Sequence, residues 1–181
     1  IALWDIRGKT LNAPVYKLLG GRTNPKLRAY ASQIQFGWSS KQGVFLGAPE
    51  LYAEAAQQAV AEGYDAIKVD PFQVDKNGKP GVHNFGLLKY DDLKLYRDRL
   101  VAIRNAVGPA VDIILECHTG TDVNSAVQFG RMIEDLNIYY MEETCAPLNP
   151  VLQKRVKEKL NIPLAGGERI YSRFGYRPFF E

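Results

Sequence analysis

The sequence has few of the features that mark secreted, membrane-bound or nucleic-acid-binding proteins. Its 181 residues include only two cysteines, Cys117 and Cys145, which are too few for a disulfide framework and are expected to be reduced packing residues. No apolar run approaches the roughly 18 residues that a membrane-spanning helix needs, and residues 1–8 lack a signal-peptide pattern. The 23 basic and 20 acidic residues form no block of like charge. We therefore expect a cytoplasmic protein with neither a membrane nor a nucleic-acid partner.

The chain is long enough to bury a sizeable core, and 46% of its residues are hydrophobic, which excludes a disordered chain. Short β-branched runs alternate with amphipathic helical stretches, a pattern typical of parallel α/β sheets. The expected strands are residues 27–32, 66–69, 111–115, 138–141 and 162–165. The expected helices are residues 49–63, 90–107, 122–136, with Asp122 as the cap, and 150–160.

Two segments lie outside this alternation. Residues 1–21 are expected to form a helix that stops at Gly20 and Gly21, and they begin inside a helical pattern, so we expect the chain to be part of a longer protein. Residues 71–89 form a long loop that we expect to cover the functional site and to be poorly ordered without ligand.

Three of the expected strands lead into a carboxylate. Glu142 follows Glu116 by 26 residues, and Glu168 follows Glu142 by the same number, which is one strand-helix unit each time. Because the carboxyl ends of parallel strands meet at one edge of a sheet or barrel, these carboxylates should converge. A single glutamate at a strand end is usually a solvated or capping residue, but three in register favour a divalent metal site. Oxygen ligands favour Mg²⁺.

Two further residue types suggest proton transfer beside these carboxylates. His118 lies two residues after Glu116, so strand alternation points it to the same side, and its imidazole can carry a proton near neutral pH. A surface histidine is the alternative, which we prefer for His83. Lys68, at the end of the second strand, either binds a substrate carboxylate, transfers a proton or is a solvated edge lysine, and Asp70 shares its parity.

Several motifs together resemble the enolase superfamily, in particular its mandelate racemase and muconate lactonizing enzyme group and the acid-sugar dehydratases of the galactonate and mannonate type. Residues 2–9 and 14–21 resemble the junction between that group's capping domain and its barrel. The segment Gly63-Tyr-Asp-Ala-Ile-Lys68 resembles the second strand. The motifs Glu116-Cys-His118, Glu142-Glu143 and Gly166-Gly-Glu168-Arg169 resemble the ends of the third, fourth and fifth strands.

The resemblance implies a partial TIM-like (β/α) barrel with about five of its eight strands. Residues 1–21 would be the end of the capping domain and a linker helix, and residues 22–181 the first part of the catalytic barrel, without the last strands. It further implies a lyase of sugar-acid catabolism, with Glu116, Glu142 and Glu168 binding Mg²⁺. Abstraction of the α-proton would give an enediolate, and His118 would protonate the leaving hydroxyl. Lys68 would bind the substrate carboxylate or assist proton transfer, and Asp70 would contact the substrate. A small sugar acid is the expected substrate, and a homo-oligomer the expected assembly.

Two residues depart from the family pattern. The first ligand is usually aspartate, and Glu116 is one methylene longer; Asp70 stands where racemases and cycloisomerases often have a second lysine. The second departure disfavours a racemase or epimerase, which needs a base on each face of one carbon. A catalytically inert metal-binding paralogue is the remaining alternative, against which the presence of His118 beside three carboxylates counts.

Overall fold

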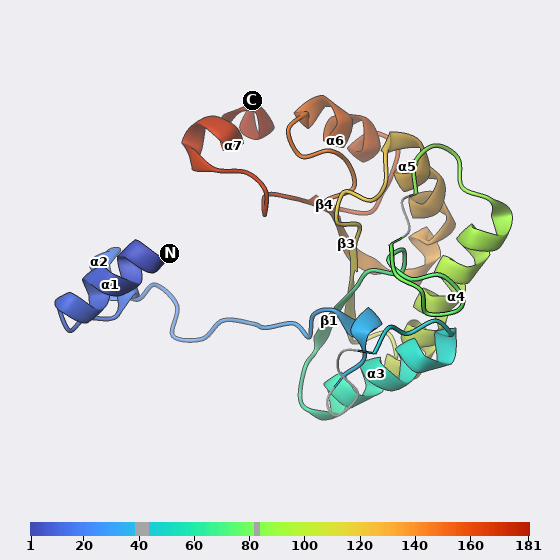
Figure 1. The fold of residues 1–181 in the computed structure, drawn as a ribbon, viewed down its shortest axis with the longest axis horizontal. Helices are drawn as coiled ribbons and strands as arrows, with labels where there is room; N and C mark the ends of the chain where they lie inside the picture. Colours follow the sequence, from blue (N-terminus) through green and yellow to red (C-terminus); the bar gives the residue numbers. More distant parts are fainter. Residues whose placement is uncertain (39–43, 82–83) are drawn as a thin grey trace.

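The computed structural model describes residues 1–38, 44–81 and 84–181, in which the strands form a four-stranded parallel sheet (Figure 1). The strands, in their spatial order, are β1 (Ala66–Val69), β2 (Asp112–Glu116), β3 (Ile138–Glu142) and β4 (Leu164–Ala165). The helices are α1 (Ala2–Thr10), α2 (Val15–Leu18), α3 (Pro49–Ala61), α4 (Tyr90–Val107), α5 (Val123–Met132), α6 (Pro150–Lys157) and α7 (Ser172–Phe180), with 3₁₀ turns η1 (Ile34–Phe36) and η3 (Glu134–Leu136). The predicted α/β class with parallel strands is confirmed.

The strand predicted at residues 27–32 is wrong as a regular strand. Only Ala31 pairs with β1, donating its N–H to the Ala66 carbonyl (2.9 Å) and accepting the N–H of Lys68 (2.7 Å). The pairing ends there because Gln33 has a left-handed backbone (φ 64°) and η1 begins at the next residue. Among the described residues, the sheet therefore has four strands, with Ala31 joined to β1 by an isolated bridge, in place of about five strands.

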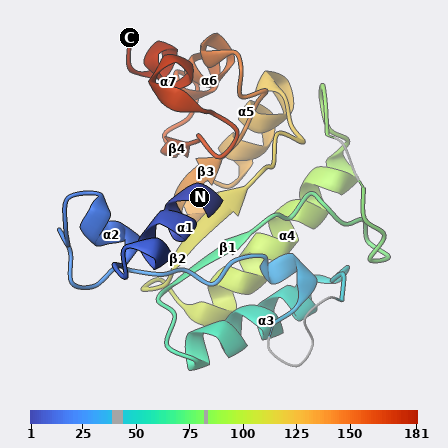
Figure 2. The same cartoon turned by 60° about the vertical axis from the view of Figure 1, so that its left-hand side comes forward.

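The amino-terminal helix is also interrupted. Pro14 lacks an N–H group and Asn12 has a φ of 47°, so residues 1–21 form two helices, α1 and α2, in place of one. The predicted glycine stop is confirmed, since Gly20 and Gly21 have φ values of 113° and 100°. In Figure 1 the two helices lie at the far end of an extended segment from the sheet, whereas in the turned view of Figure 2 α1 overlaps the strands. A domain boundary at residue 21 stays a prediction.

Local sequence accounts for most of the other elements. The Asp122 carboxylate accepts the N–H groups of Asn124 and Ser125, and the Ser125 hydroxyl accepts the N–H of Asp122, which confirms the predicted cap of α5. Proline at the first helical position, together with the Asn149 cap, starts α6. The sequence pattern missed α7, whose glycine and internal Pro178 weaken its helical signal. Among the described residues, no helix is both long and apolar enough to cross a membrane.

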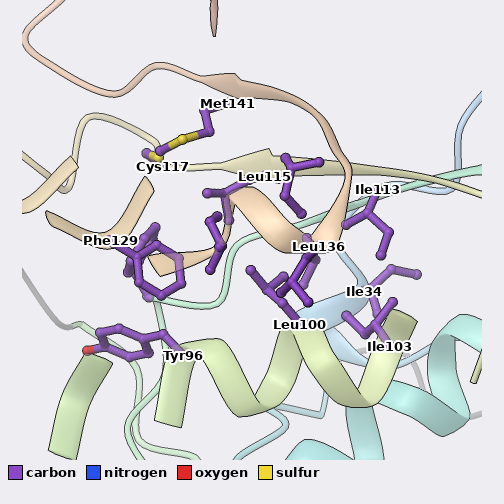
Figure 3. Packing of buried hydrophobic residues seen from close by; sticks show 14 of the residues in the cluster. Ile34, Tyr96, Leu100, Ile103, Ile113, Leu115, Cys117, Phe129, Leu136 and Met141 are labelled. Carbon is purple, nitrogen blue, oxygen red and sulfur yellow. The ribbon is translucent and has the colours of Figure 1, made fainter. Parts of the chain in front are cut away.

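Alternation along the strands separates the core from the site. One face of the sheet packs against the helices; its buried residues include Ile67, Val69, Ile113, Leu115 and Met141. Figure 3 shows Leu115 on the same side as Leu100 of α4 and Phe129 of α5. The alternate residues of the same strands, among them Lys68 and Glu116, face the opposite way. The apolar helical layer therefore sets which strand residues reach the site.

The segment that follows β1 is fixed by one buried arginine and one phenylalanine. Arg99 of α4 is fully buried and donates five hydrogen bonds of 2.6–3.1 Å to main-chain carbonyl oxygens; these belong to Gly47, Pro71, Val74 and Asp75. Phe72 packs edge-on against Tyr96 and Phe129, with ring centroids 5.1 and 5.0 Å away. Because Asp70 lies just before this segment, these contacts set its position.

The rest of the predicted covering loop lies at the same end of the strands. Gln73 accepts the N–H of Gly81, and Asn84 donates its N–H to Gly120, close to His118. Residues 82 and 83, including His83, lie outside the described residues. The location agrees with a loop beside the site, whereas its order without ligand stays a prediction.

We expect Arg99→Met to lower the free energy of unfolding by about 3 kcal/mol, because it leaves several buried carbonyl groups without donors. The matched control is Arg97→Met on the same helix, which loses an ion pair with exposed Asp135 and a hydrogen bond to one partly buried carbonyl, that of Met132. The effect should be about 1 kcal/mol. Urea unfolding of the full-length protein measures both changes. Equal shifts of the two transitions would contradict this reading of Arg99.

Candidate active site

Glu116 ends β2 with its carboxylate turned into the protein. The residue is 1% exposed, and Oε1 accepts the N–H groups of Cys117 (3.1 Å) and His118 (2.9 Å). Oε2 lies 2.6 Å from Nζ of Lys68, although the angles fall outside hydrogen-bond geometry. One oxygen thus holds the turn after the strand, and the other faces a cation.

Lys68 bridges two carboxylates. Its Nζ lies 2.6 Å from Oε2 of Glu116 and donates a hydrogen bond of 2.9 Å to Oε2 of Glu142, and it lies 5.5 Å from the centre of the Tyr30 ring. The β2–β3 register places Glu116 opposite Glu142, so the two carboxylates arrive side by side. Burial lowers the pKa of Lys68, but its close contacts with the two carboxylates outweigh burial and raise the pKa above the usual value. Lys68 is therefore a charged ammonium in this arrangement.

His118 is held by Asp70. Nδ1 of His118 lies 2.7 Å from Oδ2 of Asp70, whose Oδ1 accepts the N–H of Phe72 (2.8 Å). Asp70 is 1% exposed, so this contact is shielded from water. The hydrogen bond to Asp70 raises the pKa of His118, which outweighs the opposing effect of burial. With Nδ1 engaged, Nε2 is the nitrogen left for proton transfer.

The turn that carries His118 is conformationally unusual. His118 and Thr119 both have left-handed backbones, with φ values of 46° and 57°. Such conformations cost roughly 1–3 kcal/mol each and persist only where surrounding contacts fix them. Here the Glu116 carboxylate accepts the His118 N–H and the Glu143 carbonyl accepts the Thr119 N–H. The strain is a cost of keeping the imidazole beside Asp70.

One cavity of about 170 Å³ brings most of the predicted site residues together. Its lining includes Lys68, Asp70, Glu116, His118 and Glu168. The side chain of Glu168 is 43% exposed and its Oε1 lies 3.2 Å from Nε of Arg169. Glu142 reaches this group through Lys68. Five residues selected from sequence thus line a single cavity, and the sixth adjoins it.

The carboxylates suit a hard cation, although their present arrangement is not that of a metal centre. Within the described ranges, no three His, Cys, Asp or Glu side chains lie close enough together to hold a metal ion. The ammonium of Lys68 lies between Glu116 and Glu142, and the buried Oε2 of Glu116 has no hydrogen-bond partner in the part of the chain that the structure describes. Two converging carboxylates that share one cation are chemically suited to Mg²⁺. Glu116, Glu142 and Glu168 as its ligands stay a prediction.

Glu143 is a site residue whose position the sequence did not indicate. It is 1% exposed, adopts a left-handed φ of 51°, and its Oε1 accepts the N–H of Gly167 (3.0 Å). Burial raises its pKa. Strand alternation alone would point Glu143 to the side opposite Glu142. The pair of adjacent glutamates is visible in the sequence, but nothing in it indicates the left-handed backbone at Glu143.

Comparison with known proteins identifies the family. The family model "Enolase C-terminal domain-like" matches residues 51–181, which is more than half of the chain. The chain belongs to this family. A crystal structure of an enolase superfamily member from Salmonella Typhimurium superposes on 98% of the chain with a TM-score of 0.93 and 56% sequence identity. The resemblance inferred from the motifs, and with it the partial enolase-type barrel, is therefore confirmed.

Several curated relatives of this enolase-family chain are named as sugar-acid dehydratases, and one, from Agrobacterium fabrum, as a D-galactarolactone cycloisomerase. The D-gluconate/D-galactonate dehydratase of Picrophilus torridus is 33% identical over 176 residues, which are 96% of this chain and 40% of that protein. The D-gluconate dehydratase of Thermoproteus tenax is 32% identical over 172 residues, 95% of this chain and 31% of that protein. The Salmonella structure is covered to 46%. The chain thus spans less than half the length of these relatives.

Replacing Asp70 by asparagine should lower the pKa of His118, because the carboxylate that stabilises the imidazolium is removed. In the parent protein the raised pKa contributes stability that is present below the unfolded-state pKa and lost as the pH rises through the folded-state pKa. NMR titration of the imidazole in metal-free full-length protein measures the shift, with His83→Gln used to separate the two histidines of the chain.

The matched control for this titration is Asp75→Asn. Asp75 lies in the same segment, but its carboxylate accepts the N–H groups of Asn77 and Lys79 and leaves His118 untouched. The pKa of His118 should not change in this variant. A pKa that is equally unchanged in Asp70→Asn would mean that the contact between Asp70 and His118 does not persist in solution.

Proposed function

We propose that the protein containing this chain is a Mg²⁺-dependent lyase that dehydrates a sugar acid. The observation that carries the proposal is the cavity in which an ammonium, two carboxylates and an aspartate-held imidazole lie together. The names of the curated relatives support this substrate class. Because related folds host different reactions, these side chains support dehydration more strongly than the fold does.

Mg²⁺ held by Glu116, Glu142 and Glu168 would supply Lewis-acid stabilisation of the charge that develops on the substrate carboxylate. Lys68 is charged and 9% exposed, which suits it to binding that carboxylate once the acid enters the cavity. An ammonium with a raised pKa is a poor base. Of the two functions considered for Lys68, its environment therefore favours substrate binding over proton abstraction.

His118 is suited to protonate the leaving group. In the overall change, the α-carbon loses a proton to a base, the β-carbon loses its hydroxyl, and a double bond forms between the two carbons. The hydroxyl departs as water with the proton from Nε2 of His118, and the enol product tautomerises to a 2-keto-3-deoxy acid. Asp70 holds the imidazole by Nδ1 and favours its protonated form before the reaction. A direct contact between Asp70 and the substrate stays a prediction.

Activity is tested by incubating the full-length protein with Mg²⁺ and a panel of aldonates that includes D-gluconate, D-galactonate and D-xylonate. Formation of a 2-keto-3-deoxy acid with at least one of them is expected, and chelation with EDTA should abolish it. Racemisation or epimerisation without loss of water would show that the proposed reaction is wrong. Binding of Mg²⁺ without turnover of any acid would point to an inert paralogue.

His118→Asn should reduce the dehydration rate by on the order of 100- to 10,000-fold, because asparagine keeps a polar side chain of similar size but cannot donate a proton. Affinity for Mg²⁺ should change little, since His118 is not among the proposed ligands. Glu142→Gln is the contrasting variant, in which weakened Mg²⁺ binding should precede the loss of turnover. Steady-state rates and calorimetric Mg²⁺ titrations measure both effects. Unchanged turnover in His118→Asn would remove it from the mechanism.

A further inference from the structure

Glu143 occupies a position where a carboxylate is costly to keep. It follows β3 directly, is 1% exposed and has a left-handed backbone with a φ of 51°. Its Oε2 is buried without a hydrogen-bond partner among the described residues, and lies 3.6 Å from Nε of Arg169. Burying a carboxylate that is only partly satisfied is unfavourable, and an apolar side chain would fill the same space at lower cost. Packing alone therefore does not explain a glutamate here.

The main chain of Glu143 connects the turns that follow two other strands. Its N–H donates to the Ala165 carbonyl of β4 (3.1 Å), and its carbonyl accepts the N–H of Thr119 (2.8 Å), the residue after His118. The turn that carries the imidazole is thus bonded to the residue that also pairs with β4. Glu143 lies between the two parts of the site that approach from β2 and from β4.

The side chain of Glu143 reaches the turn that carries Glu168. Its Oε1 accepts the N–H of Gly167 (3.0 Å), and Gly167 has a φ of 133° that side-chain-bearing residues rarely adopt. Arg169 lies on the other side of Glu168, with Nε 3.2 Å from Oε1 of Glu168 and Nη2 donating to the His118 carbonyl at 3.4 Å. Both neighbours of Glu168 are therefore held by contacts with Glu143 or His118.

We propose that Glu143 is a positioning residue, which orients the turn at residues 166–169 so that Glu168 faces the same cavity as Glu116 and His118. This inference rests on the proposed function, in which Glu168 is a metal ligand. The Gly167 carbonyl already accepts the Tyr176 hydroxyl (2.9 Å) and the Ile170 N–H (3.0 Å), so Glu143 fixes the remaining N–H side of this residue. Because Gly167 precedes Glu168, a rotation of the peptide on that side would turn the Glu168 side chain toward solvent, to which 43% of it is already exposed. Groups that orient metal ligands typically change metal affinity by roughly 10- to 100-fold when they are removed.

Two variants of the full-length protein test the proposal. Glu143→Met keeps the length of the side chain and removes the acceptor, whereas Glu143→Gln keeps an acceptor oxygen for the Gly167 N–H. Glu143→Met should weaken Mg²⁺ binding by on the order of 10-fold or more, and should speed hydrogen–deuterium exchange of the peptide that contains Gly167. Glu143→Gln should restore both values to within about threefold of the parent, since the hydrogen bond is kept. Calorimetry with Mg²⁺ alone and mass spectrometry measure the two quantities.

Glu134→Met is the matched control. Glu134 also accepts a main-chain N–H, from Asn161 at 2.9 Å, but it lies in η3, which precedes β3, at the opposite end of the sheet. Its loss should leave Mg²⁺ affinity and exchange at Gly167 unchanged. If the Glu143→Met variant matches the parent in both measurements, or if Glu143→Gln loses as much as Glu143→Met, the proposal is overturned.

Neither measurement needs a substrate, so the inference and the proposed function can fail separately. Loss of Mg²⁺ affinity and faster Gly167 exchange in Glu143→Met would support the inference even if no sugar acid were dehydrated. Conversely, the protein could dehydrate a sugar acid while Glu143→Met left both Mg²⁺ affinity and Gly167 exchange unchanged. That result would support the proposed function and refute the positioning role of Glu143.

Discussion

The arrangement of this site depends on the parallel register between β2 and β3. That register sets Glu116 directly opposite Glu142 at the carboxyl ends of the strands. Two carboxylates at neighbouring strand positions repel each other, and the repulsion grows as water is excluded. A cation between them is then required, and Lys68 on the adjacent strand supplies it through contacts of 2.6 and 2.9 Å. The sheet thus brings two negative charges together and also places the positive charge of Lys68 that partly neutralises them.

A divalent cation and the Lys68 ammonium would both neutralise the negative charge of Glu116 and Glu142. The proposed Mg²⁺ site therefore requires Lys68 to give up part of its contact with the carboxylates and to turn toward the substrate, whose own carboxylate can replace them. The side chain of Glu168 has room to turn toward a bound cation, because it is far more exposed than that of Glu116. The rigid part of the site is the β2 end, where two main-chain N–H groups hold the Glu116 carboxylate.

The proton-transfer part of the site is built by a different means. Asp70 and His118 come from separate turns, and their contact requires both turns to be held. Arg99 and Phe72 anchor the segment after Asp70 to the helical layer, while Glu116 and Glu143 accept the N–H groups of the strained turn at residues 118 and 119. The core and the site are therefore coupled, since the residues that bury Phe72 also set the distance between Asp70 and His118.

The sequence by itself determined the alternation of strands and helices, the cap at Asp122 and the convergence of Glu116 and Glu168 on one cavity, because hydrophobic period and strand spacing are local properties. Only the tertiary structure decided that residues 27–32 pair at Ala31 alone, that Lys68 bridges Glu116 and Glu142, and that Glu143 reaches Gly167. The first and the third depend on left-handed backbones at Gln33 and Glu143, and the second depends on contacts between strands that are distant in the sequence. Such conformations are unfavourable locally and exist only because packing elsewhere in the chain holds them, which no local pattern records.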